Sequence, residues 1–177
     1  VHDDLVKRHL KAEQPDQVWL TDITEHWTDE SRLYMCAFKD ICSRRIVGDA
    51  LSDRMTSALA VRALDNAVIG RNYRGTIVHS DRGSQFRSQA FVAPLQHHKV
   101  TGTMARVGAC GDNAMMESFF SLLQKNVLDR ERWRTRSEKL GQRCALTGGP
   151  APKGRPSFYW STAGLVAVAV SARASVQ

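Results

Sequence analysis

The sequence predicts an α/β fold in which helices flank a five-stranded mixed sheet. Three β-prone runs near residues 17–25, 31–41 and 44–52 follow one another through connections short enough for an antiparallel meander. An alanine-rich helical segment comes next, followed by two shorter strand-like runs that each precede another helix. Strands that alternate with helices indicate that crossover connections build the second half of the sheet.

The first strand contains an acidic residue in an apolar setting. Residues 18–24 are rich in aromatic and β-branched side chains, which favours a strand with both faces covered. An unpaired charge in such a strand is costly, so Asp22 stands out. The simpler interpretation is that a single aspartate in a strand caps a turn or lies at an edge.

The segment after the third strand has the pattern of an amphipathic helix of about 14 residues. Thr56 and Ser57 offer N-terminal caps. Apolar side chains recur after them at spacings of three and four, at Ala58, Val61, Leu64 and Val68. The helix leads into a short strand at 76–79, and placing that strand beside the first would bring Asp22 and Asp81 together.

Two further acids follow at positions typical of functional groups. Asp81 opens a turn rich in glycine and small polar residues at the end of the short strand. Glu117 lies in the first turns of a helix that follows a loop at 105–112, with Asp112 or Asn113 as its N-cap. Each acid alone also fits ordinary turn or surface chemistry.

The remaining elements complete the predicted α/β pattern. A helix is expected near 88–97 and a strand near 100–104. The helix of Glu117 carries an apolar stripe that should pack on the sheet and fix where the carboxylate points: Met116, Phe119, Phe120, Leu123 and Val127.

Together, the three acids have the composition of a divalent-metal cage for phosphodiester chemistry. Mg²⁺ and Mn²⁺ prefer hard oxygen ligands, and three carboxylates can hold two ions about 4 Å apart. One ion then activates the attacking oxygen while the other stabilises the leaving oxygen. Clustered carboxylates repel one another, so cations should order the site.

Three segments of the chain closely resemble the catalytic core of insertion-sequence transposases. They are WLTDIT at 19–24, VHSDRGSQF at 78–86 and GDNAMMESFFSLL at 111–123. The most similar group is the OrfB type of the IS-three family, which is related to retroviral integrases. The resemblance runs from about residue 15 to residue 140 and includes the D,D-35-E spacing of that family.

This resemblance implies a ribonuclease H-like fold and a Mg²⁺- or Mn²⁺-dependent reaction, with two ions, in which a hydroxyl attacks a DNA phosphodiester. Water as the nucleophile gives strand cleavage, and a DNA 3′-hydroxyl gives strand transfer. By motif position, Asp22, Asp81 and Glu117 match the catalytic metal-binding carboxylates. The implied partners are insertion-sequence ends, target DNA and further copies of the chain.

Several basic residues are candidates for phosphate contacts, which position DNA without reading its sequence. They are Arg71, Arg74, Arg82, Arg87, Lys99 and Arg106. Asn113 matches a residue of the family motif that could orient substrate or cap the helix. Many relatives have a lysine or arginine seven residues after the glutamate; here that position is Gln124, and the neighbouring Lys125 is the remaining candidate.

Length and charge divide the chain into three expected regions. A chain of 177 residues suits one domain with tails: an N-terminal arm at 1–14, the integrase-like core at 15–140 and an atypical tail at 141–177. The tail has four basic residues and no acidic ones, so it supplies more than half of the net charge of +7. Its glycines and prolines break helices, and we expect it to be disordered or frameshift-derived.

Cysteine usage and hydropathy predict a bacterial cytoplasmic protein. The four cysteines form no CxxC pair and are interpreted as reduced thiols: Cys36, Cys42, Cys110 and Cys144. The longest apolar run, 163–170, is far shorter than a membrane span, and no secretory leader is expected. The amino end lacks a helix-turn-helix pattern, so recognition of element ends is expected on an upstream segment or a partner polypeptide.

Two alternatives to an active transposase core remain open at this point. A catalytically inactive remnant that still binds DNA would keep the same carboxylates, and the unusual tail favours it. A ribonuclease H-like nuclease acting on RNA in hybrids would share the fold, because one architecture hosts many chemistries. The transposase-like segments around Asp22 and Glu117 favour DNA as the substrate.

Overall fold

The computed structural model describes residues 12–104, 114–129 and 134 of the chain. The strands are β1 (Val18–Trp27), β2 (Arg32–Asp40), β3 (Ile46–Ser52), β4 (Ile77–Ser80) and β5 (Thr101–Met104). The helices are α1 (Ser57–Val68), α2 (Ser84–Arg87), α3 (Gln89–His97) and α4 (Ala114–Leu123), which continues as the π-helix η1 (Gln124–Leu128). The expected loop at 105–112, both proposed caps of the Glu117 helix and the tail at 141–177 lie outside the described residues.

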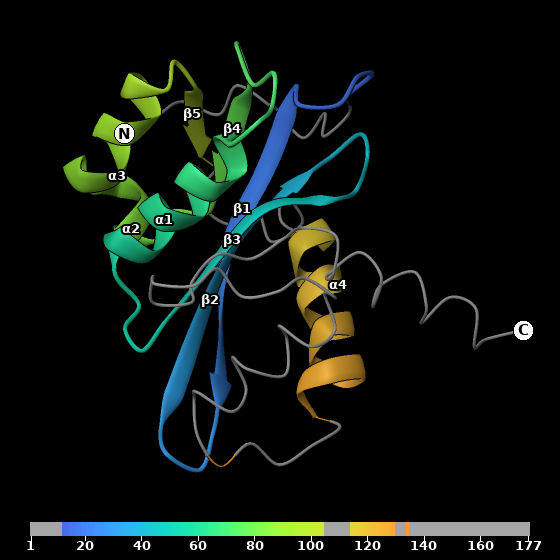
Figure 1. Cartoon of the computed structure of the whole chain (residues 1–177), viewed down its shortest axis with the longest axis vertical. Helices are drawn as coiled ribbons and strands as arrows, with labels where there is room; N and C mark the ends of the chain where they lie inside the picture. Colours follow the sequence, from blue (N-terminus) through green and yellow to red (C-terminus); the bar gives the residue numbers. More distant parts are fainter. Residues whose placement is uncertain (1–11, 105–113, 130–133, 135–177) are drawn as a thin grey trace, which may run out of the picture.

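The five strands form one mixed sheet in the order β3-β2-β1-β4-β5. β1 pairs antiparallel with β2, and β2 pairs antiparallel with β3, because short turns join these strands. β4 returns parallel to β1, and β5 parallel to β4 (Figure 1). The five-stranded mixed sheet flanked by helices is therefore confirmed, with β4 beside β1 as the helical crossover predicts.

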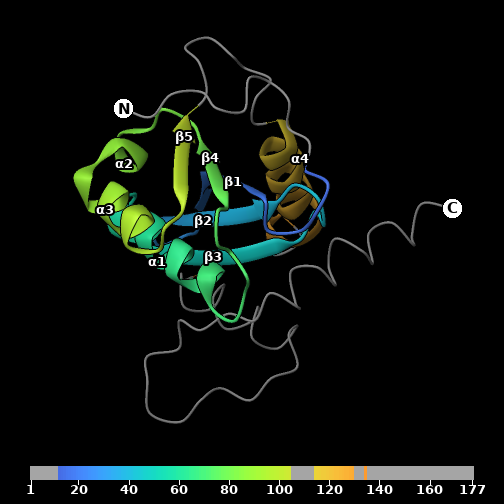
Figure 2. The same ribbon diagram turned by 90° about the horizontal axis from the view of Figure 1, so that it is seen from above.

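Helices cover both faces of the sheet and bury a separate apolar core on each (Figure 2). Side chains of β1 alternate between these cores, so Trp19 packs on the side of α1 to α3 and Leu20 on the side of α4. The Trp19 and Phe38 rings meet edge to face with centroids 6.5 Å apart. No helix in the described part of the chain is long and apolar enough to cross a membrane.

Helix α1 packs through a different stripe from the predicted one. Its buried side chains are Leu59, Ala60, Ala63, Leu64 and Ala67, whereas Ala58 is exposed and Val61 and Val68 are half-buried. The small residues face the sheet because the helix backbone approaches Gly48 of β3 very closely. A Cβ on Gly48 would lie 2.4 Å from the backbone nitrogen of Ala67. Thr56 occupies the N-cap position, but its side chain makes no capping hydrogen bond.

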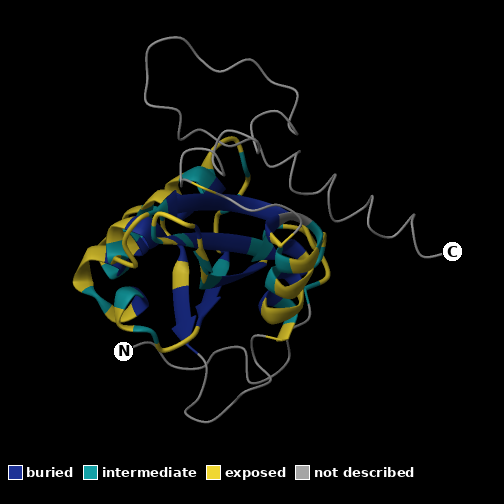
Figure 3. Ribbon diagram, turned by 90° about the horizontal axis from the view of Figure 1, so that it is seen from below, coloured by how far each residue is buried: buried dark blue, intermediate teal, exposed yellow. Residues whose placement is uncertain are grey.

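The apolar stripe of α4 agrees with the sequence analysis. Met116, Phe119 and Leu123 are buried against the sheet and Phe120 is half-buried, while the outer surface of the helix is exposed (Figure 3). The side chain of Val127, also expected in the stripe, is outside the described part. The one-turn helix α2 and the π-helical continuation η1 were not predicted, since periodicity carries little signal for such short features.

We expect Gly48→Ala to reduce the free energy of unfolding by about 3 kcal/mol, because the new methyl group must displace helix backbone rather than a flexible side chain. Gly70→Ala is the matched control: its φ of +67° is strained for alanine, yet nothing lies within 4 Å of the added atom. Its cost should be about 1 kcal/mol. Urea unfolding measures both, and equal losses would show that α1 does not depend on this close approach.

Candidate active site

Asp22 of β1 lies beside Asp81, which follows the end of the adjacent parallel strand β4. Thr21 of β1 is aligned with Ser80, the last residue of β4, so Asp22 follows on β1 and Asp81 comes directly after β4. Adjacent strands lie about 4.8 Å apart. Alternation from Leu20 places Asp22 on the face that α4 covers, and alternation from Ile77 places Asp81 on the same side.

Glu117 reaches this face from α4. The helix docks through Met116, which is fully buried, and the next residue along, Glu117, is exposed beside that buried contact. Successive residues are about 100° apart around a helix, so Glu117 lies at the border between the packed and the solvent-facing sides. Packing of Met116 and Phe119 thus decides where this carboxylate can point.

The pKa of Asp22 is sensitive to burial and to both of the other acids. The pKa of Asp22 is raised from 3.8 to about 6, mainly by burial and in smaller part by the negative charges of Asp81 and Glu117. The backbone N–H of Ile23, which donates to Asp22 Oδ1 at 2.7 Å, lowers the pKa in part. Asp22 is therefore within electrostatic reach of both Asp81 and Glu117.

Local hydrogen bonds orient the carboxylate of Asp81 as well. Asp81 Oδ1 accepts a bond of 2.9 Å from the backbone N–H of Gly83, closing a tight turn after β4. A Cβ on Gly83 would lie 3.0 Å from this oxygen, so a larger residue at position 83 would crowd the Asp81 carboxylate. Asp22 and Asp81 are thus held by their own backbone, whereas Glu117 depends on helix packing.

Three carboxylates are suitable ligands for a divalent cation, but these three side chains do not surround a common point. No group of three or more His, Cys, Asp or Glu side chains within residues 12–104 and 114–129 is arranged to hold a metal ion. The pKa of Asp22 nevertheless responds to both other acids, so they are near but not closed around one point. An all-carboxylate set suits Mg²⁺ or Mn²⁺, and a cation would relieve the repulsion.

The candidate DNA contacts divide into two groups. Arg82 and Arg87 are exposed just after Asp81, and Lys125 is exposed on η1 beyond Glu117. Arg106 and Asn113 lie outside the described residues.

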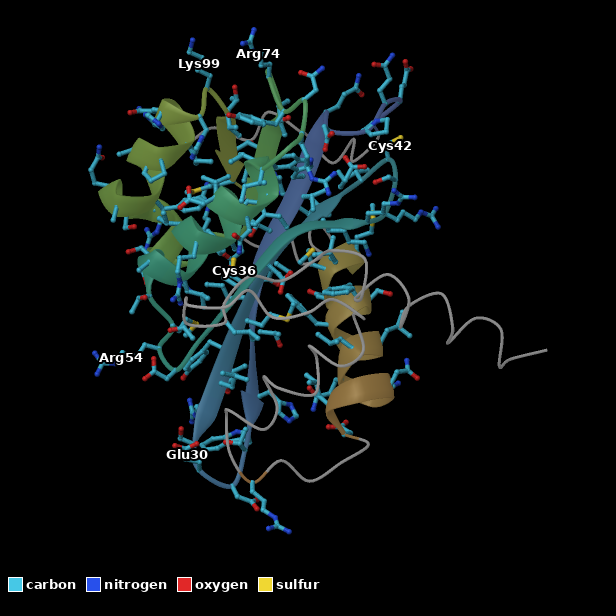
Figure 4. The ribbon with its side chains drawn as sticks, in the orientation of Figure 1. Glu30, Cys36, Cys42, Arg54, Arg74 and Lys99 are labelled. Carbon is cyan, nitrogen blue, oxygen red and sulfur yellow. The ribbon has the colours of Figure 1, made fainter. Side chains whose placement is uncertain are left out.

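The second group lies at the opposite ends of the strands. Arg71 and Arg74 precede β4 and Lys99 precedes β5, whereas Asp81 follows β4, so about 13 Å of strand intervenes. Arg74 and Lys99 share one end of the molecule (Figure 4). The structure therefore separates these three basic residues from the acids.

Two polar contacts between the sheet and the α4 region were missed by the sequence analysis. Gln124 Oε1 accepts a hydrogen bond of 2.9 Å from His26 Nδ1, so the residue seven positions after Glu117 bonds to β1. Lys39 Nζ donates to the Met115 carbonyl oxygen at 3.3 Å. The only sequence signal for the second contact is a lysine inside the apolar strand run MCAFKD.

Cys36 and Cys42, the cysteines among the described residues, are free thiols. Cys36 is fully buried in the core on the α1 side, and burial raises the pKa of its thiol to about 12. Its role is packing. Cys110 and Cys144 lie outside the described residues.

The raised pKa of Asp22 predicts how stability depends on pH without metal. Below 3.8 the carboxyl is neutral in both states, but between 3.8 and about 6 the folded state keeps a proton that the unfolded state releases. Stability therefore falls as pH rises through this window, and Asp22→Asn removes the loss. After discounting for partial exposure, the variant should gain on the order of 1–2 kcal/mol relative to wild type.

Urea unfolding in EDTA at about pH 3.5 and about pH 7.5 measures this gain. Glu13→Gln, which changes an exposed acid before β1, is the control and should show no such pH-dependent gain. A stability difference between wild type and Asp22→Asn that is the same at both pH values would contradict the raised pKa.

Solved structures share this architecture. The structure of the HTLV-2 integrase catalytic core domain in complex with magnesium, in its dimeric form, aligns with a TM-score of 0.55 and 16% identity, covering 83% of this chain and 95% of that chain. An intasome of simian T-cell lymphotropic virus in complex with PP2A regulatory subunit B56 gamma gives a TM-score of 0.57 at 16% identity, covering 84% and 54%. Integrase cores have the ribonuclease H-like fold, so that expectation is confirmed.

Sequence relatives agree with the fold. Transposase InsF for insertion sequence IS3A of Escherichia coli (strain K12) is 39% identical over 137 residues, 77% of this chain and 48% of the relative. A transposase for insertion sequence element IS904 of Lactococcus lactis subsp. lactis (strain IL1403) is 37% identical over 137 residues, 76% of this chain and 54% of the relative. The chain spans about half the length of these relatives.

The family model of the integrase core domain matches residues 12–110, more than half of the 177-residue chain. The matched region contains β1 to β5 with Asp22 and Asp81, and it ends before α4. The chain therefore belongs to the integrase core domain family, together with the IS3-type transposases that it resembles.

Proposed function

We propose that this chain is the catalytic core of a DDE transposase that cleaves and joins DNA strands with divalent metal. The observation that supports the proposal most is that Asp22 of β1 lies beside Asp81 after β4, with Glu117 of α4 near enough to influence the pKa of Asp22. Asp22 lies on β1, Asp81 follows the end of the adjacent strand β4, and Glu117 contributes to the raised pKa of Asp22. The transposase relatives supply the substrate class, which is DNA.

The reaction has two steps of the same kind. In cleavage, a water oxygen forms a bond to phosphorus while the bond to the 3′-oxygen breaks, and that oxygen takes up a proton to become a 3′-hydroxyl. In strand transfer, this hydroxyl attacks a target phosphodiester, so one phosphodiester forms as another breaks. The number of phosphodiester bonds is conserved in the second step, and no energy-supplying cofactor is needed.

In this proposal Asp22, Asp81 and Glu117 hold Mg²⁺ or Mn²⁺, with two ions in the complete site. When bound, the ions would lower the pKa of the attacking hydroxyl and stabilise the leaving oxygen. The backbone bonds of Ile23 and Gly83 orient the two aspartates before metal arrives. This restraint reduces the entropy lost on closure.

Exposed basic residues near the acids would hold the DNA backbone. We assign phosphate contacts to Arg82 and Arg87 beyond Asp81 and to Lys125 beyond Glu117, because all three are exposed. Arg106 and Asn113 complete the proposed set through their positions in the sequence motifs. Such contacts make affinity depend on salt rather than on base sequence.

The relatives contain about as much sequence again outside the matched region. Recognition of the element ends is assigned to a helix-turn-helix segment or partner polypeptide, and synapsis of two ends to a homo-oligomer. Target DNA enters this assembly as a second substrate.

A second candidate is a DNA-binding protein that no longer catalyses. The open arrangement of the acids favours it, because no metal-holding group of three is formed within the described residues. This candidate and the catalytic one share every phosphate contact. They differ only in whether Asp22, Asp81 and Glu117 close around metal.

We expect Asp81→Asn to lower the rate of DNA nicking and joining at least about 1,000-fold, because a proposed metal ligand loses its charge while the side chain keeps its shape. The assay uses plasmid DNA carrying the ends of the source element, with Mn²⁺ or with EDTA. Asp65→Asn, an exposed acid on α1, is the matched control and should keep wild-type rates. Far-UV circular dichroism checks that both variants fold.

Equal rates in wild type and Asp81→Asn would refute catalysis by these acids. DNA binding without metal-dependent cleavage by the wild type would instead support the non-catalytic candidate. Cleavage of an RNA–DNA hybrid in preference to duplex DNA would replace the transposase assignment by a ribonuclease H-like one.

A further inference from the structure

Lys39 is a cation on the inner face of the sheet beneath α4. It belongs to β2 and pairs with Leu20 of β1, whose side chain lies in the core on the α4 side. On the same face of the sheet, the next cross-strand pair is Ala37 opposite Asp22. Lys39 and Asp22 therefore belong to neighbouring cross-strand pairs on the face that α4 covers.

The half-buried side chain of Lys39 contacts α4 on both sides of Glu117. Its Nζ donates to the Met115 carbonyl oxygen at 3.3 Å, two residues before Glu117. The same atom lies 5.5 Å from the centroid of the Phe119 ring, two residues after Glu117. One ammonium group thus touches the helix before and after the acid.

These two contacts restrain the two movements of α4 that would displace Glu117. A shift of α4 along its axis changes the distance from Nζ to the Met115 carbonyl, and a rotation carries the Phe119 ring away from the ammonium. Glu117 is exposed, and its backbone is part of α4. Its position relative to Asp22 therefore follows the docking of α4.

We propose that Lys39 is a positioning residue that holds the first turns of α4 where the Glu117 carboxylate can join Asp22 and Asp81 around a divalent cation. This inference rests on the proposed function, because it assigns the three acids to metal. Lys39 itself binds neither the cation nor DNA in this role.

Packing alone does not account for a lysine at this position. Burial lowers the pKa of Lys39, as does the nearby charge of Arg44, so its ammonium is held there at an electrostatic cost. A methionine would fill similar space without that cost. The ammonium adds a directional hydrogen bond to the backbone of α4. Such a bond helps to orient the helix and with it the carboxylate of Glu117.

The far end of the same helical segment provides a matched control. His26 of β1 bonds to Gln124 at the start of η1, so this contact also ties the segment to the sheet. It lies seven residues beyond Glu117, about two helical turns away. Losing it should loosen the segment without redirecting Glu117.

The test measures Mn²⁺ binding by calorimetric titration of the DNA-free chain, alongside urea unfolding. Lys39→Met should weaken Mn²⁺ affinity about 10- to 100-fold, the range typical of groups that orient metal ligands. Lys39→Arg, which keeps a donor and the charge, should bind within about fivefold of wild type. His26→Ala should lose comparable stability while its Mn²⁺ affinity stays within about threefold of wild type.

Wild-type Mn²⁺ affinity in Lys39→Met would overturn the inference and leave the metal site intact. Equal weakening in Lys39→Met and His26→Ala would also overturn it, since general loosening of the helix would then explain both. If Lys39→Met does not fold, Lys39→Gln replaces it under the same criteria. No Mn²⁺ binding by the folded wild type would refute the proposed function itself, which is a separate outcome.

Discussion

The parallel pairing of β4 with β1 is the constraint on which the candidate site depends. The alignment of Thr21 with Ser80 sets Asp22 beside Asp81, although 58 residues separate the two acids in the chain. A shift of one residue in either strand would turn one carboxylate to the opposite face. The close approach of α1 to Gly48 supports this sheet, because α1 is part of the crossover that delivers β4 in register.

This arrangement has an electrostatic cost that the fold must offset. Asp22 is in a largely covered strand, and two further negative charges raise its pKa above its ordinary value. Sites under such tension usually trade stability for function. The apolar cores on both faces of the sheet offset this cost.

The sequence was sufficient to locate the strands and to place β4 beside β1, and insufficient for the position of β5 and for side-chain contacts. Periodicity and turn residues located β1 to β5, and the crossover rule placed β4 beside β1. The buried stripe of α1 was misassigned because a glycine on another strand selects it, and no local pattern contains that information. Lys39 and His26 escaped notice for the same reason, since their partners lie 76 and 98 residues away. The catalytic roles of the three acids stay a prediction.

Convergence of Asp22, Asp81 and Glu117 on divalent cations is tested most directly by a crystal structure of the chain grown with Mn²⁺, with data collected for anomalous scattering. The predicted result is one or two anomalous peaks with oxygens of all three carboxylates at about 2.2 Å, and with Glu117 turned towards the sheet. A peak bound by other residues, or Mn²⁺ absent from a site where Glu117 points to solvent, would contradict it.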